Sequence, residues 1–160
     1  GLGDVYKRQM HEFIKAAYDY QDNTFHSHPG YYIDYFEMRL AQLQVLHNLH
    51  YEIKKIRKMP KQALVIADYI MYMADYVVEM NIPDQQIEKL EEISEQMKQE
   101  ELPKTREEFE GRALLYHILM DLEEFLVYKK RFVNGLDEKK LRIYWKQEME
   151  QKDSANELQK

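Results

Sequence analysis

The chain contains no cysteine, and this absence excludes two kinds of site. None of its 160 residues can form a disulfide or supply a thiolate to a metal ion. The lack of thiols suits a reducing compartment. Glycine and proline are scarce, at five and four residues, and dipeptides typical of β-turns are almost missing. The sequence therefore predicts a helical protein.

Basic residues and long apolar runs are also in short supply. Lysine and arginine total 23 against 29 acidic residues, which gives a net charge of −6. Because binding to phosphates needs a basic face, we expect no nucleic-acid partner. The most apolar stretch, residues 63–80, is interrupted by acidic residues, so no segment reaches the roughly 18 apolar residues of a membrane span. A hydrophobic content of 44% nevertheless supports one folded domain.

The first nine residues, GLGDVYKRQ, have no apolar core followed by small residues and so do not form a secretory signal. They read as translated adapter sequence, and we expect residues 1–9 to be a non-native leader on a coding sequence truncated at its 5′ end. Residues 10–134 are predicted to form a helical bundle domain. Residues 135–160 are predicted to contain a tail helix and a frayed C-terminus.

The central helical pattern covers residues 102–130. Thr105 and Glu108 form a capping box, in which the threonine oxygen accepts the Glu108 amide proton and the carboxylate reaches back to the Thr105 amide. Two apolar stripes follow: Phe109, Ala113, Tyr116 and Met120, and beside them Leu115, Leu119, Leu122 and Leu126. A helix that is apolar over so much of its circumference should be central, with neighbours on at least two sides. Asn134-Gly135 predicts a left-handed cap at its end.

The other predicted helices span residues 10–23, 31–59, 61–80, 84–99 and 136–149. In the second of these the predicted buried stripe is Phe36, Leu40, Leu43, His47, His50 and Ile53. The third carries Leu64, Ala67, Met71, Ala74 and Val78 on one face and Val65, Tyr69, Tyr72 and Tyr76 on the other. Short connections between long helices favour antiparallel neighbours. We predict an all-α fold: an elongated up-and-down antiparallel bundle of four main helices with flanking N- and C-terminal helices.

No pattern of catalytic residues is present. Glu107 and Glu108 are adjacent and so point in different directions on a helix, which excludes an acid–base pair. The sequence contains no nucleophile motif, phosphate-binding loop or dinucleotide fingerprint. We therefore expect a protein that is not an enzyme, with no catalytic residues and no cofactor.

Six histidines raise the question of a metal site. His26 and His28 fall in a predicted loop, and His47 and His50 fall in an apolar helical stripe. A zinc site needs three or four ligands with supporting hydrogen bonds, and neither pair supplies them. Histidines that pack at the edge of a core are the more common reason for such a pair, so we expect no metal site.

Charged residues inside apolar stripes are the candidates for ligand binding. Arg39 and Arg112 lie among apolar neighbours, as do Asp68, Asp75 and Asp121. A half-buried charge needs a counter-charge, so we favour Arg–carboxylate pairs between helices. In the alternative, Arg39 or Arg112 binds the carboxylate of an anionic ligand.

Aromatic side chains would complete such a ligand site. The chain has thirteen tyrosines, whose common role is to bridge core and solvent. The alternative is an aromatic-lined pocket. The candidate ligand-binding residues are therefore Arg39, Arg112, Tyr35 and Tyr116.

Two stretches carry a family resemblance. YYIDYFEMRLAQLQVL, at residues 31–46, and LPKTREEFEGRALLYHILMDLEEFL, at residues 102–126, are similar to the first and last long helices of the C-terminal domain of the bacterial aromatic acid exporter family. The resemblance covers roughly residues 12–132. It implies a cytoplasmic helical domain that follows an N-terminal membrane half, so the expected partner is the membrane half of the same protein. It also implies aromatic carboxylic acids as the substrate class.

These observations leave three hypotheses for function. The leading one is a non-catalytic cytoplasmic domain of an exporter-like protein, acting in assembly or regulation at the cytoplasmic side of the bacterial membrane, with this fragment alone soluble. The second is a free-standing bundle that binds a small aromatic acid. The third is a structural interaction domain, homo-oligomers included. Its mark would be an exposed apolar patch on residues 10–23 or 61–80.

Overall fold

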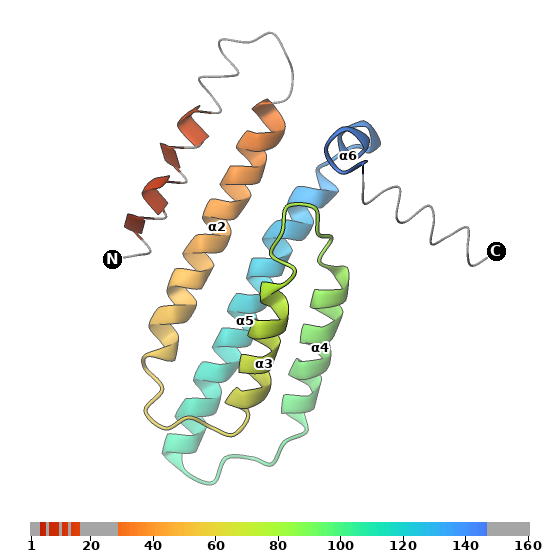
Figure 1. Ribbon diagram of the computed structural model, residues 1–160. Helices are drawn as coiled ribbons and strands as arrows, with labels where there is room; N and C mark the ends of the chain where they lie inside the picture. Colours follow the sequence, from red (N-terminus) through yellow and green to blue (C-terminus); the bar gives the residue numbers. More distant parts are fainter. Residues whose placement is uncertain (1–3, 6, 10, 13, 17–28, 147–160) are drawn as a thin grey trace, which may run out of the picture.

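All the regular structure in the described residues is helical. The computed structural model describes residues 4–5, 7–9, 11–12, 14–16 and 29–146, and within these ranges it contains no strand. The helices are α2 (Pro29–Ile53), α3 (Ala63–Ala74), α4 (Asp84–Lys98), α5 (Arg106–Asn134) and α6 (Glu138–Tyr144), as Figure 1 shows. The described residues before α2 are helical as well. The predicted all-α class is confirmed.

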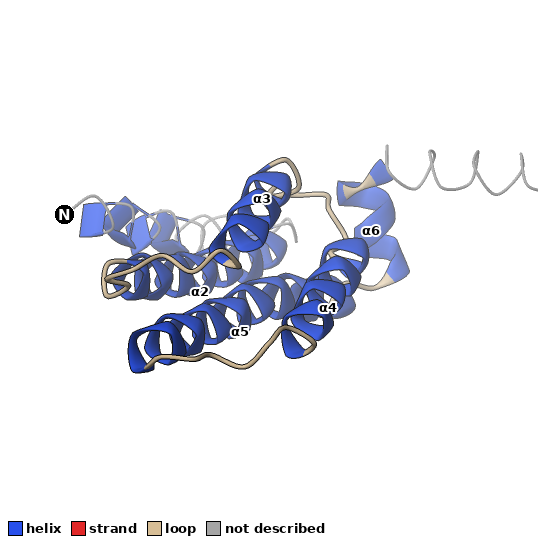
Figure 2. Ribbon diagram, turned by 90° about the horizontal axis from the view of Figure 1, so that it is seen from below, coloured by secondary structure: helices blue, strands red, loops and turns tan. Residues whose placement is uncertain are grey.

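Helices α2 to α5 lie side by side and alternate in direction, whereas α6 lies beyond the end of α5 (Figures 1 and 2). Helix α5 contacts α2, α3 and α4, and α3 also contacts α4. This is the predicted up-and-down bundle, with α5 at its centre. The division into residues 1–9, 10–134 and 135–160 stays a prediction, and most of the helix expected at residues 10–23 lies outside the described residues.

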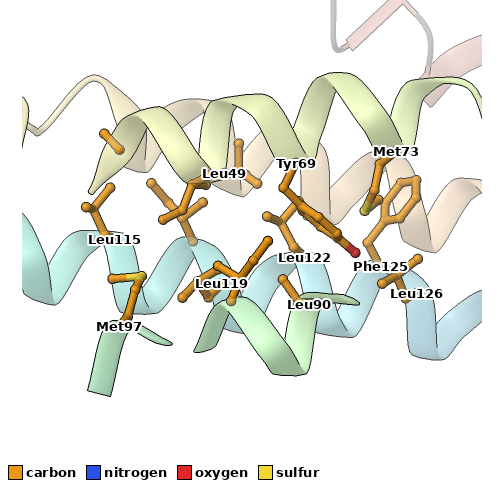
Figure 3. Close-up of a cluster of buried hydrophobic side chains, with 14 of the residues drawn as sticks. Leu49, Tyr69, Met73, Leu90, Met97, Leu115, Leu119, Leu122, Phe125 and Leu126 are labelled. Carbon is orange, nitrogen blue, oxygen red and sulfur yellow. The ribbon is translucent and has the colours of Figure 1, made fainter. Parts of the chain in front are cut away.

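The main core forms where α5 meets the other three helices (Figure 3). The predicted leucine stripe of α5 is buried, and it packs against side chains from each neighbour: Leu49 of α2, Tyr69 and Met73 of α3, and Leu90 and Met97 of α4. The Tyr69 hydroxyl donates a 2.6 Å hydrogen bond to the backbone carbonyl of Gln86, which satisfies a buried polar group. This contact ties α3 to α4 inside the core.

The prediction of which side chains form the buried face of α2 is wrong. The buried side chains are instead Tyr31, Ile33, Met38, Gln42, Val45 and Leu49, while His47 and His50 are exposed. The pattern misled because the buried face includes a glutamine. Its amide Nε2 donates to the backbone carbonyl of Phe125 at 2.8 Å, so a polar residue marks the contact with α5.

Helices α3 and α5 also carry exposed apolar faces. Leu64 and Met71 of α3 are 71% and 73% exposed, and the buried residues of α3 are Ala63, Ile66, Tyr69 and Met73. Helix α3 is apolar around most of its circumference, so periodicity alone cannot select the buried side. On α5 the stripe of Phe109, Ala113, Tyr116 and Met120 is exposed rather than buried, with Phe109 at 60% and Met120 at 64%.

Helices α2 and α3 both end about six residues earlier than predicted. After α2 the chain turns through residues 54–62 and crosses close to the first turns of α5. The crossing is tight, because a Cβ on Gly111 would lie 3.0 Å from Pro60 Cγ and 3.4 Å from the Lys58 carbonyl oxygen. The absence of a side chain at Gly111 therefore lets the loop pack against α5.

The ends of α5 match the sequence in position but not in every contact. Thr105 Oγ1 accepts from the Glu108 amide at 3.1 Å, as the capping box predicts. The Glu108 carboxylate accepts from the Lys104 amide at 2.9 Å instead of the Thr105 amide. Gly135 follows the helix but has a right-handed backbone, with φ −78°, so the predicted left-handed cap is wrong. The chain continues directly into α6, whose first turn is capped by Asp137.

Candidate functional site

The four predicted ligand-binding residues form two separate pairs. Arg39 and Tyr35 are neighbours on α2: Arg39 Nε donates to the Tyr35 hydroxyl at 3.0 Å, and the guanidinium lies 5.1 Å from the centre of the ring. Arg39 Nη1 also donates to Gln42 Oε1 at 2.7 Å. Two polar groups and an aromatic face therefore already hold the arginine.

A small cavity lies beside Arg39, between α2, α5 and the segment that follows α3. Its volume is about 20 Å³, which is room for about one water molecule. Buried Lys129 lines it and donates to the backbone carbonyls of Val78, at 3.1 Å, and Glu79. An aromatic acid would need these side chains to move apart before it could enter.

Arg112 and Tyr116 line a different site, an open groove of about 210 Å³ between the end of α4, the following loop and α5. Arg112 is buried and its Nη1 donates to the backbone carbonyl of Glu101. Tyr116 and Phe109 are exposed along the groove. This groove is large enough for a small aromatic molecule, and its floor carries a cation.

The predicted Arg–carboxylate pairs are wrong for the described part of the chain. Neither Arg39 nor Arg112 has a described carboxylate within 4.0 Å, because their partners are a hydroxyl, an amide and a backbone carbonyl. Asp68 and Asp75 are exposed. Only Asp121, among the three aspartates, is buried.

The histidine pairs do not form a cluster that the structure describes. His47 and His50 are exposed on α2, and His26 and His28 lie outside the described residues. Their roles stay predictions.

One group of titratable side chains was missed by the sequence reasoning. Glu52 of α2 meets His117 and Asp121 of α5: His117 Nδ1 lies 2.7 Å from Glu52 Oε1 and 3.6 Å from Asp121 Oδ2. Burial, together with the neighbouring Glu52 carboxylate, raises the pKa of the Asp121 carboxyl to about 6. The spacing of His117 and Asp121, four residues apart on one helix, was the available signal. Glu52 carried none.

Exposed apolar side chains lie in a row on one side of α5 and in the loop before it. They comprise Leu102, which is 85% exposed, and the stripe Phe109, Ala113, Tyr116 and Met120. We call them the α5 surface. Over the described ranges, no helix is long and apolar enough to cross a bilayer.

Comparison with known proteins gives consistent matches. The model of the family described as "Putative aromatic acid exporter C-terminal domain" matches residues 4–130. The "Uncharacterized protein YqjA" of Bacillus subtilis (strain 168) is 29% identical over 128 residues, which are 78% of this chain and 40% of YqjA. The chain therefore spans less than half the length of that curated relative.

A solved structure has the same fold. The crystal structure of a "putative membrane protein" from Clostridium difficile 630 superposes with a TM-score of 0.70 and 26% identity, covering 81% of this chain and 77% of the other. The family match covers more than half of the chain and includes both stretches in which the resemblance was seen. The chain belongs to the family of aromatic acid exporter C-terminal domains.

Proposed function

We propose that this chain is the cytoplasmic domain of an exporter-like membrane protein and that it acts in assembly or regulation rather than in catalysis. Three facts support the proposal. The chain belongs to a family named for the C-terminal domain of an exporter. It covers only 40% of YqjA. The similar solved structure is also of a protein named as a membrane protein.

The observation that carries the assembly role is the α5 surface. Helix α5 is the central helix of the bundle, yet Phe109 and Met120 on one side of it are 60% and 64% exposed. Exposed large apolar residues in a row are a common mark of a contact surface. Each such side chain contributes on the order of 1.5–3 kcal/mol when it is fully buried. We assign the surface to contact with the part of the longer protein that lies outside this chain.

The polar groups also favour a role without catalysis. The cations at the predicted ligand sites, Arg39, Lys129 and Arg112, each donate to protein groups that hold them in place. Such bonds orient a side chain for packing and leave fewer donors for a reacting substrate.

The first test is the DNA sequence upstream of the Met10 codon in the source genome. An open frame that encodes several apolar segments of about 20 residues each would support the exporter-like reading. An in-frame stop directly before Met10 would contradict it and leave a free-standing helical protein.

The second test is photo-crosslinking in membranes that contain the full-length protein. A photoreactive phenylalanine analogue replaces Phe109, which lies in the α5 surface, and the matched control carries it at Glu107, which is exposed two residues away. We expect a crosslink from position 109 to another part of the same polypeptide and none from position 107. A crosslink to a second copy would assign the surface to a homo-oligomer, and equal labelling from both positions would overturn the proposal.

A second candidate function is binding of a small aromatic acid in the groove of Arg112 and Tyr116. The observation that favours it is a cation beside exposed aromatic rings in a groove of about 210 Å³. Titration with benzoate followed by NMR should then shift resonances that line the groove. Tyr116→Ala should weaken binding, whereas Tyr51→Ala, which changes an exposed tyrosine on α2, should not. Shifts spread evenly over the surface would exclude this function.

A further inference from the structure

Three side chains with metal-binding atoms converge where the last turn of α2 meets the middle of α5. Glu52 comes from α2, and His117 and Asp121 lie one turn apart on α5. One oxygen or nitrogen from each residue lies within 4.8 Å of the other two. We propose that Glu52, His117 and Asp121 bind a single divalent transition-metal ion between α2 and α5.

The burial of the two carboxylates supports a cation at this point. Asp121 is only 7% exposed, and both its Oδ2 and Glu52 Oε2 are buried without a hydrogen-bond partner among the described residues. A buried and a half-buried carboxylate side by side repel each other and lose hydration, and each buried oxygen without a hydrogen bond adds to the cost. A doubly charged cation would neutralise both carboxylates, and the oxygens that lack a hydrogen bond would bind to it.

The ligand types select the class of ion. An imidazole nitrogen suits zinc and other later transition metals, and carboxylate oxygens suit zinc, manganese and magnesium. The mixed set of one nitrogen and two carboxylates therefore fits Zn²⁺ or Mn²⁺ better than Ca²⁺ or a copper ion. The bonds would be about 2.0–2.2 Å long, so small side-chain rotations would bring the three ligands onto one ion.

Solvent access allows the ion to enter and to complete its coordination. His117 has 57% of its side chain exposed, whereas Glu52 has 15% and Asp121 has 10%. The site is thus closed on the carboxylate side and open beside the imidazole, where water molecules can fill the remaining positions. Because Nδ1 faces the carboxylates, Nδ1 is the imidazole atom that would bind the ion.

Because of its position, a bound ion would link two helices of the bundle. Glu52 and His117 belong to the two longest helices of the bundle, which contact each other directly. A bound ion would hold the end of α2 against α5 next to the loop that passes over Gly111. Occupancy of the site would therefore raise the stability of the whole bundle.

The test uses the full chain without an affinity tag, treated with a chelator and titrated separately with Zn²⁺ and Mn²⁺. We expect calorimetry to give one ion per chain for at least one of the two metals. Thermal unfolding should move upward by at least about 5 °C at saturation. Glu52→Gln, His117→Gln and Asp121→Asn should each weaken binding by at least about tenfold and remove most of the thermal shift.

Two controls separate this site from other causes. His50→Gln changes an exposed histidine on α2 that belongs to the His47 and His50 pair, and it should leave the binding unchanged. Asp121→Asn keeps the shape of the side chain, so circular dichroism without metal should confirm that this variant folds. The proposal is overturned if neither ion binds at about 100 µM. It is equally overturned if binding survives in all three ligand variants.

Discussion

The indole Nε1 of Trp145 donates a 2.9 Å hydrogen bond to the hydroxyl of Tyr31, although the two residues are 114 positions apart. The same hydroxyl donates to Glu79 Oε1 at 2.9 Å. Trp145 is 1% exposed and belongs to a second cluster of buried residues with Tyr31, Met38, Phe132 and Val133. One hydroxyl therefore joins the start of α2, the segment after α3 and the residue that follows α6.

Tyr31→Phe should destabilise the fold by about 1–3 kcal/mol, because it leaves the buried indole N–H of Trp145 without its acceptor. Trp145 is the only tryptophan of the chain, so its fluorescence reports directly on this contact. We expect a lower unfolding midpoint in urea and a red-shifted emission before the main transition. Tyr51→Phe, at an exposed tyrosine near the other end of α2, is the control and should change neither quantity. Equal effects from the two variants would contradict the assigned role of the hydroxyl.

The bundle should lose stability at alkaline pH because two of its tyrosines are buried. Burial raises the pKa of Tyr31 and of Tyr69 above the ordinary value of 10.0. The sign follows from linkage: the neutral forms are favoured in the fold, so their contribution is complete below pH 10 and is lost as the pH rises further.

The measurement is a titration from pH 10 upward, followed by the ultraviolet absorbance of tyrosinate and by circular dichroism. The buried tyrosines should ionise later than the exposed ones and at the same pH as helix loss. Tyr69→Phe should reduce the amplitude of this late step. Late ionisation that leaves the helical signal intact would argue against the coupling.

Gly111→Ala should destabilise the bundle by about 1 kcal/mol, because the new Cβ meets Pro60 Cγ at 3.0 Å and outweighs the gain in helix propensity. The matched control is Gly30→Ala in the first turn of α2, where no atom lies within 4 Å of the new Cβ. That variant should be neutral or slightly more stable. Denaturant unfolding compares the two, and a stabilised Gly111→Ala would show that the loop moves aside freely.

Thr105→Ala should cost about 1 kcal/mol, since the hydroxyl that caps α5 is removed from the Glu108 amide. Thr105→Ser keeps the oxygen and should retain most of the stability. Thermal unfolding of the two variants isolates the hydrogen bond from the methyl group. If serine and alanine cost the same, the cap contributes little.

The sequence predicted the helices and the central place of α5, because its leucine stripe, its cap and the prolines between helices are local signals. It did not predict which second face of α5 or α3 is covered. Phe109 and Leu115 read alike in a periodic pattern, and only the placement of the neighbouring helices decides which one is buried. Choosing a face is a property of the assembled bundle, not of one helix.

In the candidate site, too, contacts within one helix could be predicted from the sequence, whereas contacts between helices could not. The pairing of Arg39 with Tyr35 follows from a spacing of four residues on one helix, which the sequence contains. The meeting of Glu52 with Asp121 depends on how far α2 extends before it turns, and the predicted helix end was six residues too late. Gln42 was overlooked for a different reason, because a buried amide bonded to the Phe125 carbonyl resembles a surface residue in the pattern.

Because α2 and α5 pack antiparallel, the resistance of the bundle to an applied force depends on the direction of that force. The first turn of α2 and the last turns of α5 lie at the same end of the molecule (Figure 1), where the Tyr31 and Phe132 rings are 5.5 Å apart. A force that pulls these two helix ends apart would peel the interface open one contact at a time. A force applied along the axis, from one end of the bundle to the other, would load all the contacts together and meet far greater resistance.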